Sequence, residues 1–417
     1  MSTPIALTPF ESRLFADLPD RELGELLKSR GLPGRRTETW RWSDLRGALR
    51  EERAPSEAYA GEVGEAPVTL DGATVITLKN GVPQAPQGVE PKPILVDGEK
   101  RGVTYVVEDG LIVSLYDQGR DIEESVAAGE ELAAMATLRP LMSISVLPTF
   151  KHAVVVRRLS DGDKGHGDNI FITVSEGAQL DIVETHEITG KPFVNSRTEI
   201  ELDAQSVCNR TIIQPKASDA VLVHTSVLRL DEEKDGVPVK LHQTTLALGA
   251  ALARHETRAE YLGKSEAKID ALYCLGDRLH NDITTHVTFC GEEAKTDQLV
   301  KGIGNGQARG VFQGKFLVER AAQRTDAKMA HHALILSKGA HINAKPELEI
   351  YADDVECAHG NTVGALDSEA LFYLRQRGLP EDQARAILID AFGGEVLERV
   401  QDETLRDQLG ALFRSAV

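Results

Sequence analysis

Two side chains near the C-terminal end of the chain, Cys357 and His359, could bind a metal ion. They lie in the run 355–359, whose composition is typical of a β-strand. Because alternate residues of a strand face the same side, we expect the thiol and the imidazole on one face, about 6.5–7 Å apart along the strand. Zinc or iron usually takes about four ligands. The pair therefore predicts half of a metal site.

The surrounding segment, residues 346–378, predicts the elements that position this pair. Apolar and polar residues alternate over 348–352, which indicates a strand, and Asp353-Asp354 separates it from the Cys-His strand. Asp367 then occupies the position of a helix N-cap, and Gly378 marks the end of that helix. The cysteine and the histidine are expected on the second of two consecutive strands, just before a helical C-terminal region.

The composition is that of an ordinary soluble protein, with 41% hydrophobic and 27% charged residues among 417. A formal charge of −18 disfavours binding to nucleic-acid phosphates, which takes a basic surface. The four cysteines form no CxxC pair and are too few for a disulfide framework, which fits a reducing cytosol. The N-terminus lacks signal-peptide features, and no stretch reaches 18 apolar residues. We expect a cytoplasmic protein that binds neither nucleic acid nor membranes.

The first 68 residues predict a helical region. Helical periodicity runs from about residue 8 to 31, with a break near Pro19 and an end at Gly31. The basic and aromatic run 35–45 holds both tryptophans, Trp40 and Trp42. Such a run can bind phosphate, but packing of the two indoles on the main body is the favoured interpretation. Residues 52–68 predict a loop or a weak helix.

From residue 69 to 344 the chain consists of short apolar runs separated by Gly, Asp, Asn and charged residues. This pattern indicates a β-sandwich, a barrel or a β-solenoid, with one helical insert at about 122–141. Similar phrases recur 27 residues apart, between Gly177 and Ala204 and again between Ala267 and Ala294, but no clean repeat exists. The absence of regularly alternating helices argues against a doubly wound α/β sheet.

The end of the chain is predicted to be helical. One helix is expected over 367–377, a second from Pro380 to about Gly393-Gly394, and a third over 395–414, where apolar residues recur at helical spacing.

Other candidate groups favour structural roles. The stretch 310–315 resembles a phosphate-binding loop but lacks its Ser/Thr, and we interpret it as a β-solenoid turn, so no nucleotide site is expected. His331 and His332 are adjacent and would face opposite sides of a strand. Asp353-Asp354 is interpreted as a turn, and no catalytic residue is assigned.

The remaining cysteines lie in apolar contexts and are interpreted as buried small side chains. A metal site formed by Cys274 and Cys290 with His280 and His286 stays as an alternative if solenoid turns stack them. Cys208 is interpreted only as a buried small side chain.

The C-terminal segment resembles the signature of the SufD family of the SUF system for iron–sulfur cluster assembly. The basic-aromatic run 35–45 is also similar to that family, so the resemblance spans nearly the whole chain. The matching runs are EIYADDV (349–355), CAHG (357–360), TVG (362–364), LD (366–367) and ALFYLR (370–375).

This resemblance implies a mainly β fold. The expected organisation is an N-terminal helical region (1–68), a right-handed parallel β-helix core (69–365) and a C-terminal helical region (366–417). The resemblance also implies a non-ATPase scaffold subunit rather than an enzyme.

Partners and ligands follow from the same resemblance. A SufB-like subunit would pair with the end of the β-helix, and a SufC-like ABC-type ATPase would dock on residues 367–417. His359 would face the SufB-like subunit, with Cys357 at the same interface, as metal ligands for an iron–sulfur cluster held transiently and shared. The assembled complex could also bind a reduced flavin. Glu356 and Ala358 depart from the usual Lys and Ser but face away from this pair.

Three alternatives remain open. A SufB-like identity is disfavoured because residues 1–207 contain no cysteine. A β-helix enzyme acting on acidic polysaccharide is disfavoured by the negative charge and by the N-terminus. A SufD-like chain without its partner could pair with itself as a homodimer through the same strands.

Overall fold

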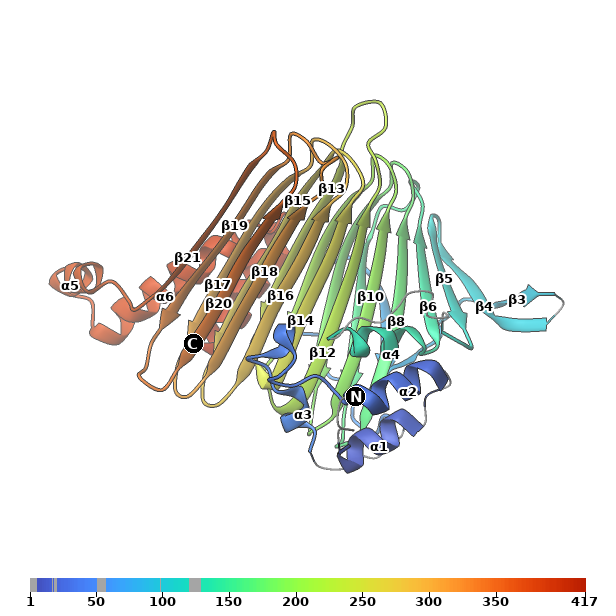
Figure 1. Cartoon of the computed structure of the whole chain (residues 1–417), viewed down its shortest axis with the longest axis horizontal. Helices are drawn as coiled ribbons and strands as arrows, with labels where there is room; N and C mark the ends of the chain where they lie inside the picture. The colour runs from blue at the N-terminus through green and yellow to red at the C-terminus, as the bar shows by residue number, and fades with distance from the viewer. Residues whose placement is uncertain (1–5, 17, 19–20, 51–57, 98, 120–128) are drawn as a thin grey trace.

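The computed structural model of the chain describes residues 6–16, 18, 21–50, 58–97, 99–119 and 129–417. Two long β-sheets face each other, and helices lie on their outer surfaces (Figure 1). The helices are α1 (Pro9–Ala16), α2 (Arg21–Arg30), α3 (Leu45–Ala48), α4 (Glu131–Thr137), α5 (Ser368–Gln376), α6 (Glu381–Leu397) and α7 (Glu403–Ala416), with a 3₁₀ turn at Glu38–Trp40.

Sheet A has the strand order β20-β18-β16-β14-β12-β10-β8-β6-β5-β4-β3, and sheet B has the order β2-β1-β7-β9-β11-β13-β15-β17-β19-β21. The strands are β1 (Thr74–Lys79), β2 (Val82–Pro83), β3 (Lys92–Val96), β4 (Glu99–Glu108), β5 (Leu111–Tyr116), β6 (Leu141–Val146), β7 (Ala153–Ser160), β8 (Gly165–Val174), β9 (Gln179–Ile188), β10 (Phe193–Leu202), β11 (Val207–Gln214), β12 (Ala217–Leu230), β13 (Val239–Ala247), β14 (Ala250–Tyr261), β15 (Ser265–Leu275), β16 (His280–Phe289), β17 (Lys295–Gly304), β18 (Arg309–Val318), β19 (Asp326–Ile335), β20 (His341–Ile350) and β21 (Glu356–Gly364).

From β6 to β21 the chain alternates between the two sheets, and each strand pairs in parallel with the strand two places later. The result is a parallel β-solenoid of about 8 turns. The predicted mainly β class, with a parallel β-helix core and helices at both ends, is confirmed. Among the described residues, no helix combines the length and apolarity needed to cross a membrane.

At the N-terminal end of the solenoid the pairing changes direction. Strands β3, β4, β5 and β6 form an antiparallel meander at the end of sheet A, and β2 pairs antiparallel with β1 at the end of sheet B. The helical insert expected at 122–141 is shorter in its described part, because Leu141 already begins β6. Residues 122–128 of that insert and 52–57 of the predicted loop lie outside the described residues.

The space between the sheets is largely apolar but contains paired charges. Arg158 contacts Asp168 at 2.9 Å and Glu184 at 2.6 Å, and Arg210 contacts Glu184 at 2.6 Å. Burial alone would raise the pKa of Glu184, but the two guanidinium groups bring it down to about 2. Since a buried charge is costly without a partner, each of these residues depends on the others.

Three buried imidazoles lie beside these charges, on β9, β12 and β14. The ring centroid of His186 is 4.6 Å from that of His224 and 6.2 Å from that of His255. Burial lowers the pKa of His255 to about 4 and the pKa values of the other two well below their usual range. The folded protein therefore holds all three rings neutral at pH 7.

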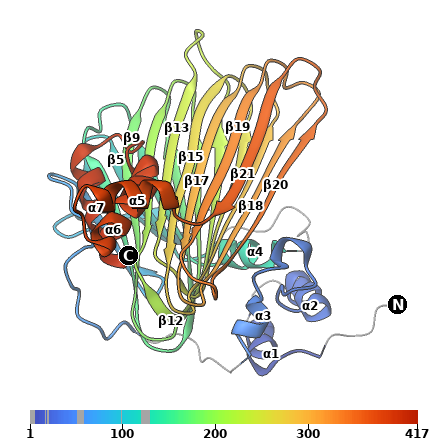
Figure 2. The same ribbon diagram turned by 90° about the vertical axis from the view of Figure 1, so that its left-hand side faces the viewer.

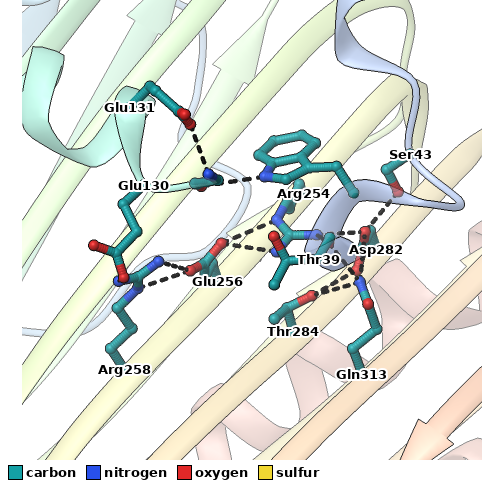
Figure 3. Close-up of polar contacts among 12 residues, drawn as sticks. Thr39, Ser43, Glu130, Glu131, Arg254, Glu256, Arg258, Asp282, Thr284 and Gln313 are labelled. Carbon is teal, nitrogen blue, oxygen red and sulfur yellow. Dashed lines mark hydrogen bonds and ion pairs between the residues drawn. The ribbon is translucent and has the colours of Figure 1, made fainter. Parts of the chain in front are cut away.

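The N-terminal helices cover the outer face of sheet A, and a buried arginine of that sheet holds them (Figures 2 and 3). Arg254 lies 4.2 Å from the ring centroid of Trp40 and donates hydrogen bonds to Glu256, Asp282 and the carbonyl of Thr39 at 2.8–3.0 Å. The predicted packing of the tryptophans on the main body is thus confirmed for Trp40, which is fully buried; Trp42 is half-buried.

The C-terminal helices α6 and α7 pack on the outer face of sheet B. The prediction that a helix ends at Gly393-Gly394 is wrong, because α6 continues to Leu397. A Cβ atom at Gly393 would lie 2.5 Å from the ring of Phe413 on α7. This glycine therefore allows the two helices to approach closely, and α7 starts at the N-cap Asp402.

Replacement of Arg254 by methionine would leave two buried carboxylates, Glu256 and Asp282, without this cation. We expect Arg254→Met to lower the free energy of unfolding by about 3–5 kcal/mol, measured by urea denaturation with tryptophan fluorescence. The control Arg324→Met removes an arginine that also contacts two carboxylates, Glu292 and Glu293, but on the surface. Equal losses in the two variants would contradict a structural role for the Arg254 network.

Acid should weaken the fold through the buried imidazoles. Because their folded-state pKa values lie below the unfolded value of about 6.5, the unfolded chain binds more protons as the pH falls from 6.5 toward 4, and stability falls with it. We expect a loss of about 1 kcal/mol per ring between pH 7.5 and 5.5, measured by urea denaturation. His255→Gln should reduce this pH dependence, whereas His341→Gln, at an exposed position, should leave it unchanged.

Candidate functional site

The solenoid ends in two strands that each have a neighbour on one side only. Strand β20 is the last strand of sheet A and pairs with β18, and β21 is the last strand of sheet B and pairs with β19. Figure 2 views the molecule from this end. Within the described part of the chain, no segment pairs with the outer edges of these two strands. We call this region, formed by β20 and β21, the open end.

Cys357 and His359 both lie on β21, on the face that points between the sheets. They are in register with Ala327 and Met329 of β19, which are buried in the interior. Cys357 packs partly against that interior, whereas His359 is exposed. The pair therefore shares one face, as the alternation of a strand predicted, and both side chains lie at the open end.

The chemistry of this pair is that of an incomplete metal site. Burial raises the pKa of the Cys357 thiol above its usual value, so the thiol is protonated at pH 7 and must lose its proton to bind a metal. Among the described residues, no group of three or more His, Cys, Asp or Glu side chains lies close enough to hold a metal ion. Two donors on an exposed edge strand could thus complete a site only with ligands from another molecule.

The other candidates have structural environments. His331 is buried and forms hydrogen bonds, as expected of a satisfied histidine, and His332 faces the opposite side and contacts Thr362. Asp353-Asp354 forms the bend between β20 and β21, where the carbonyl of Asp354 accepts a hydrogen bond from the backbone of Arg324.

Two of the three remaining cysteines are buried, as predicted, but Cys290 is only half-buried. Cys274 packs in sheet B against the C-terminal helices, whereas His280 and His286 belong to β16 of sheet A. The alternative metal site of these residues therefore has no support, because the solenoid separates its members onto different sheets.

The stretch 310–315 is not a turn, as the sequence suggested, but part of strand β18. Its glycines lie where large interior side chains approach the backbone: a Cβ atom at Gly310 would lie 2.7 Å from the ring of Tyr273, and one at Gly314 would lie 2.4 Å from the sulfur of Met329. Close packing, rather than phosphate binding, explains the glycine spacing.

A second exposed surface lies on the C-terminal helices. Helix α5 has no buried residue, and it projects beyond β21 (Figure 1). Phe372 and Tyr373 on α5 are 63% and 57% exposed, and Ile387 on α6 is 46% exposed. These side chains line a groove of about 830 Å³ between the two helices. An apolar groove of this kind is typical of a surface that binds another protein.

Sequence reasoning missed one polar side chain of the open end. Asn361 follows His359 on the same face of β21, and its carbonyl oxygen contacts the buried ring of His331. An asparagine in a strand is a weak signal by itself, and its partner becomes evident only from the pairing of β19 with β21.

Comparison with known proteins agrees with this architecture. Residues 157–392, more than half of the chain, match the family model described as "SUF system FeS cluster assembly, SufBD core domain". The chain is 25% identical to the iron–sulfur cluster assembly protein SufD of Escherichia coli over 402 residues, which cover 93% of this chain and 90% of that protein.

Two further relatives match over shorter regions. A SufBD family protein of Synechocystis is 34% identical over 253 residues, and the chloroplastic protein ABCI7 of Arabidopsis thaliana is 29% identical over 248 residues. These matches cover 58% and 57% of this chain and about half of each relative, 54% and 50%. The predicted resemblance to SufD is confirmed, and the chain belongs to the SufBD family of proteins involved in iron–sulfur cluster assembly.

Proposed function

We propose that this chain is a non-ATPase scaffold subunit of the SUF machinery that pairs with a SufB-like subunit through its open end. The observation that carries this proposal is the position of Cys357 and His359 on β21, an edge strand whose outer side has no neighbour among the described residues.

Pairing at this end would use the backbone groups of both edge strands. Strands β20 and β21 span 10 and 9 residues, and an edge of this length presents a row of unpaired N–H and C=O groups. A partner that also ends in two sheets could add a strand to each of them and so continue both sheets. The same geometry would allow a homodimer when the SufB-like subunit is absent.

The metal chemistry would then lie between the subunits. His359 and Cys357 would provide two ligands, and the SufB-like subunit would supply the others, which makes up the four that iron usually takes. The iron–sulfur cluster would be a transient cargo of the complex. Because neither subunit alone would hold a complete ligand set, cluster assembly would depend on pairing.

The C-terminal helices would dock a SufC-like ATPase. The exposed aromatic side chains of α5 and the groove between α5 and α6 form an apolar surface that is large enough to accept side chains from a partner. Helices α6 and α7 are anchored on sheet B, so the docked subunit would be held beside the open end.

Loss of the imidazole at the open end should impair cluster assembly without preventing pairing. We expect His359→Ala to co-purify with the SufB-like and SufC-like partners as the wild type does, but to yield a complex with about tenfold less cluster, measured by visible absorption and iron content. The matched control His152→Ala removes an exposed histidine near the opposite end of the solenoid. An unchanged cluster content in His359→Ala would refute the proposed role of this residue.

A charge placed on α5 should release the ATPase. We expect Phe372→Asp to abolish co-purification of the SufC-like ATPase while the SufB-like subunit remains bound, because a carboxylate in an apolar interface loses its hydration without a partner. The control Val237→Asp changes a residue that is 45% exposed in the loop before β13. Retention of the ATPase by Phe372→Asp, measured by native mass spectrometry, would exclude α5 from the docking surface.

A further inference from the structure

A hydrogen-bonded chain connects the interior of the solenoid with the open end. The hydroxyl of Tyr273 on β15 lies 2.9 Å from Nε2 of His331 on β19, and Nδ1 of His331 lies 2.7 Å from Oδ1 of Asn361 on β21. Tyr273 and His331 are fully buried, whereas Asn361 is exposed. This series of hydrogen bonds thus ends at the exposed side-chain amide of Asn361.

Asn361, at the exposed end of this series of hydrogen bonds, determines which groups donate and which accept. Oδ1 of Asn361 can only accept, so Nδ1 of His331 must carry the proton. Burial lowers the pKa of His331 to about 4, so the ring is neutral, its Nε2 accepts, and the hydroxyl of Tyr273 donates. The carbonyl oxygen of Asn361 therefore faces His331 and accepts its proton in a hydrogen bond. Its NH₂ group, which forms no hydrogen bond within the described part of the chain, has two donors available.

The packing of the interior holds the side chains of Tyr273 and His331 in place. A Cβ atom at Gly302 would lie 2.0 Å from the ring of Tyr273, and one at Gly310 would lie 2.7 Å from it. The ring of Phe312 stacks on His331, with the centroids 4.8 Å apart and the planes at 7°. Glycine weakens a strand, but at these two positions it leaves the space that the ring of Tyr273 fills. The ring, and with it the hydroxyl, is therefore held in one place.

We propose that Asn361 is a third member of the candidate site at the open end, where its NH₂ group donates hydrogen bonds to an anionic sulfur atom. Asn361 shares the inward face of β21 with Cys357 and His359, and adjacent positions on that face are about 6.5–7 Å apart. Tyr273 and His331 act as positioning residues that fix the orientation of the amide.

The class of ligand follows from the chemistry of the group. The amide oxygen is directed at His331, so the NH₂ group is the part of Asn361 left to bind a ligand. A donor group of this kind binds most strongly to an acceptor that carries negative charge. This inference rests on the proposed function, in which the ligand at this site is a sulfide or thiolate sulfur of a forming cluster. Hydrogen bonds to cluster sulfurs are among the features by which proteins tune such clusters.

Asn361→Asp provides the sharpest test, because a carboxylate can keep the bond from His331 but has no N–H group. The complex with the SufB-like and SufC-like partners would be reconstituted without oxygen from Fe²⁺ and sulfide, and loss of visible absorption would be followed after addition of an iron chelator. We expect the cluster to be lost about tenfold faster in Asn361→Asp and Asn361→Leu, from the strength of hydrogen bonds to charged groups. Tyr273→Phe should give a smaller acceleration in the same direction.

The same two strands provide a matched control. His332 of β19 and Thr362 of β21 pair one residue after His331 and Asn361, and Nδ1 of His332 lies 2.7 Å from Oγ1 of Thr362. These two side chains face the opposite side of the sheet. Thr362→Val should lose its cluster at the wild-type rate. A wild-type rate in Asn361→Asp, or an equal acceleration in Thr362→Val, would overturn the role of Asn361.

The outcome also separates this inference from the proposed function. If His359→Ala loses its cluster and Asn361→Asp does not, only the role of Asn361 is wrong. If the wild-type chain forms no complex with the partners, or its complex carries no cluster, the proposed function fails and this inference fails with it.

Discussion

The structure depends on the backbone hydrogen bonds between parallel strands, which continue from turn to turn in each of the two sheets. Every solenoid strand from β6 to β19 is paired on both sides, so its N–H and C=O groups are satisfied within the protein. A solenoid cannot satisfy the groups at its two ends in this way. At one end the antiparallel strands β2 and β3–β5 continue the sheets. At the other end, β20 and β21 leave their edges without a partner among the described residues, and the candidate ligands Cys357 and His359 lie there.

Among the described residues, the two helical regions leave the outer edges of β20 and β21 unpaired, because each region is attached to a different outer face. Arg254 holds the N-terminal segment on sheet A through Trp40 and two carboxylates, and an apolar cluster holds α6 and α7 on sheet B. Interior charges such as Arg158 on β7 of sheet B and Asp168 on β8 of sheet A are paired across the two sheets. These contacts fix the distance and register between the sheets. The positions of β20 and β21 in the last turn are therefore set by the turns before it.

The local elements of the site were easier to predict from the sequence than the β-solenoid that carries them. The shared face of Cys357 and His359 follows from the two-residue period of a strand, and the start of α5 follows from the capping side chain of Asp367. The solenoid could not be recognised from a sequence repeat, because its turns differ in length. Asp181 and Asn209, which pair in adjacent turns, are 28 residues apart in the sequence, whereas Asn209 and His242 are 33 residues apart. The second turn is longer because it contains the longer loop after β12. The roles of Gly302 and Gly310 were hidden too, since they depend on a tyrosine from another strand.

The connection between β21 and α5 shows how the two exposed surfaces could affect each other. Only residues 365–367 separate the end of β21 from the first residue of α5, and His359 lies eight residues before Asp367. Because α5 has no buried residue, it can move without exposing the core, whereas α6 is held on sheet B by its apolar face and by the contact of Glu395 with Lys301. A partner that binds α5 differently in two states would therefore act on β21 before it acts on the rest of the solenoid. The size of that effect is limited by the difference in its affinity for the two arrangements, so a regulated open end requires a docked subunit that changes state, as an ATPase does.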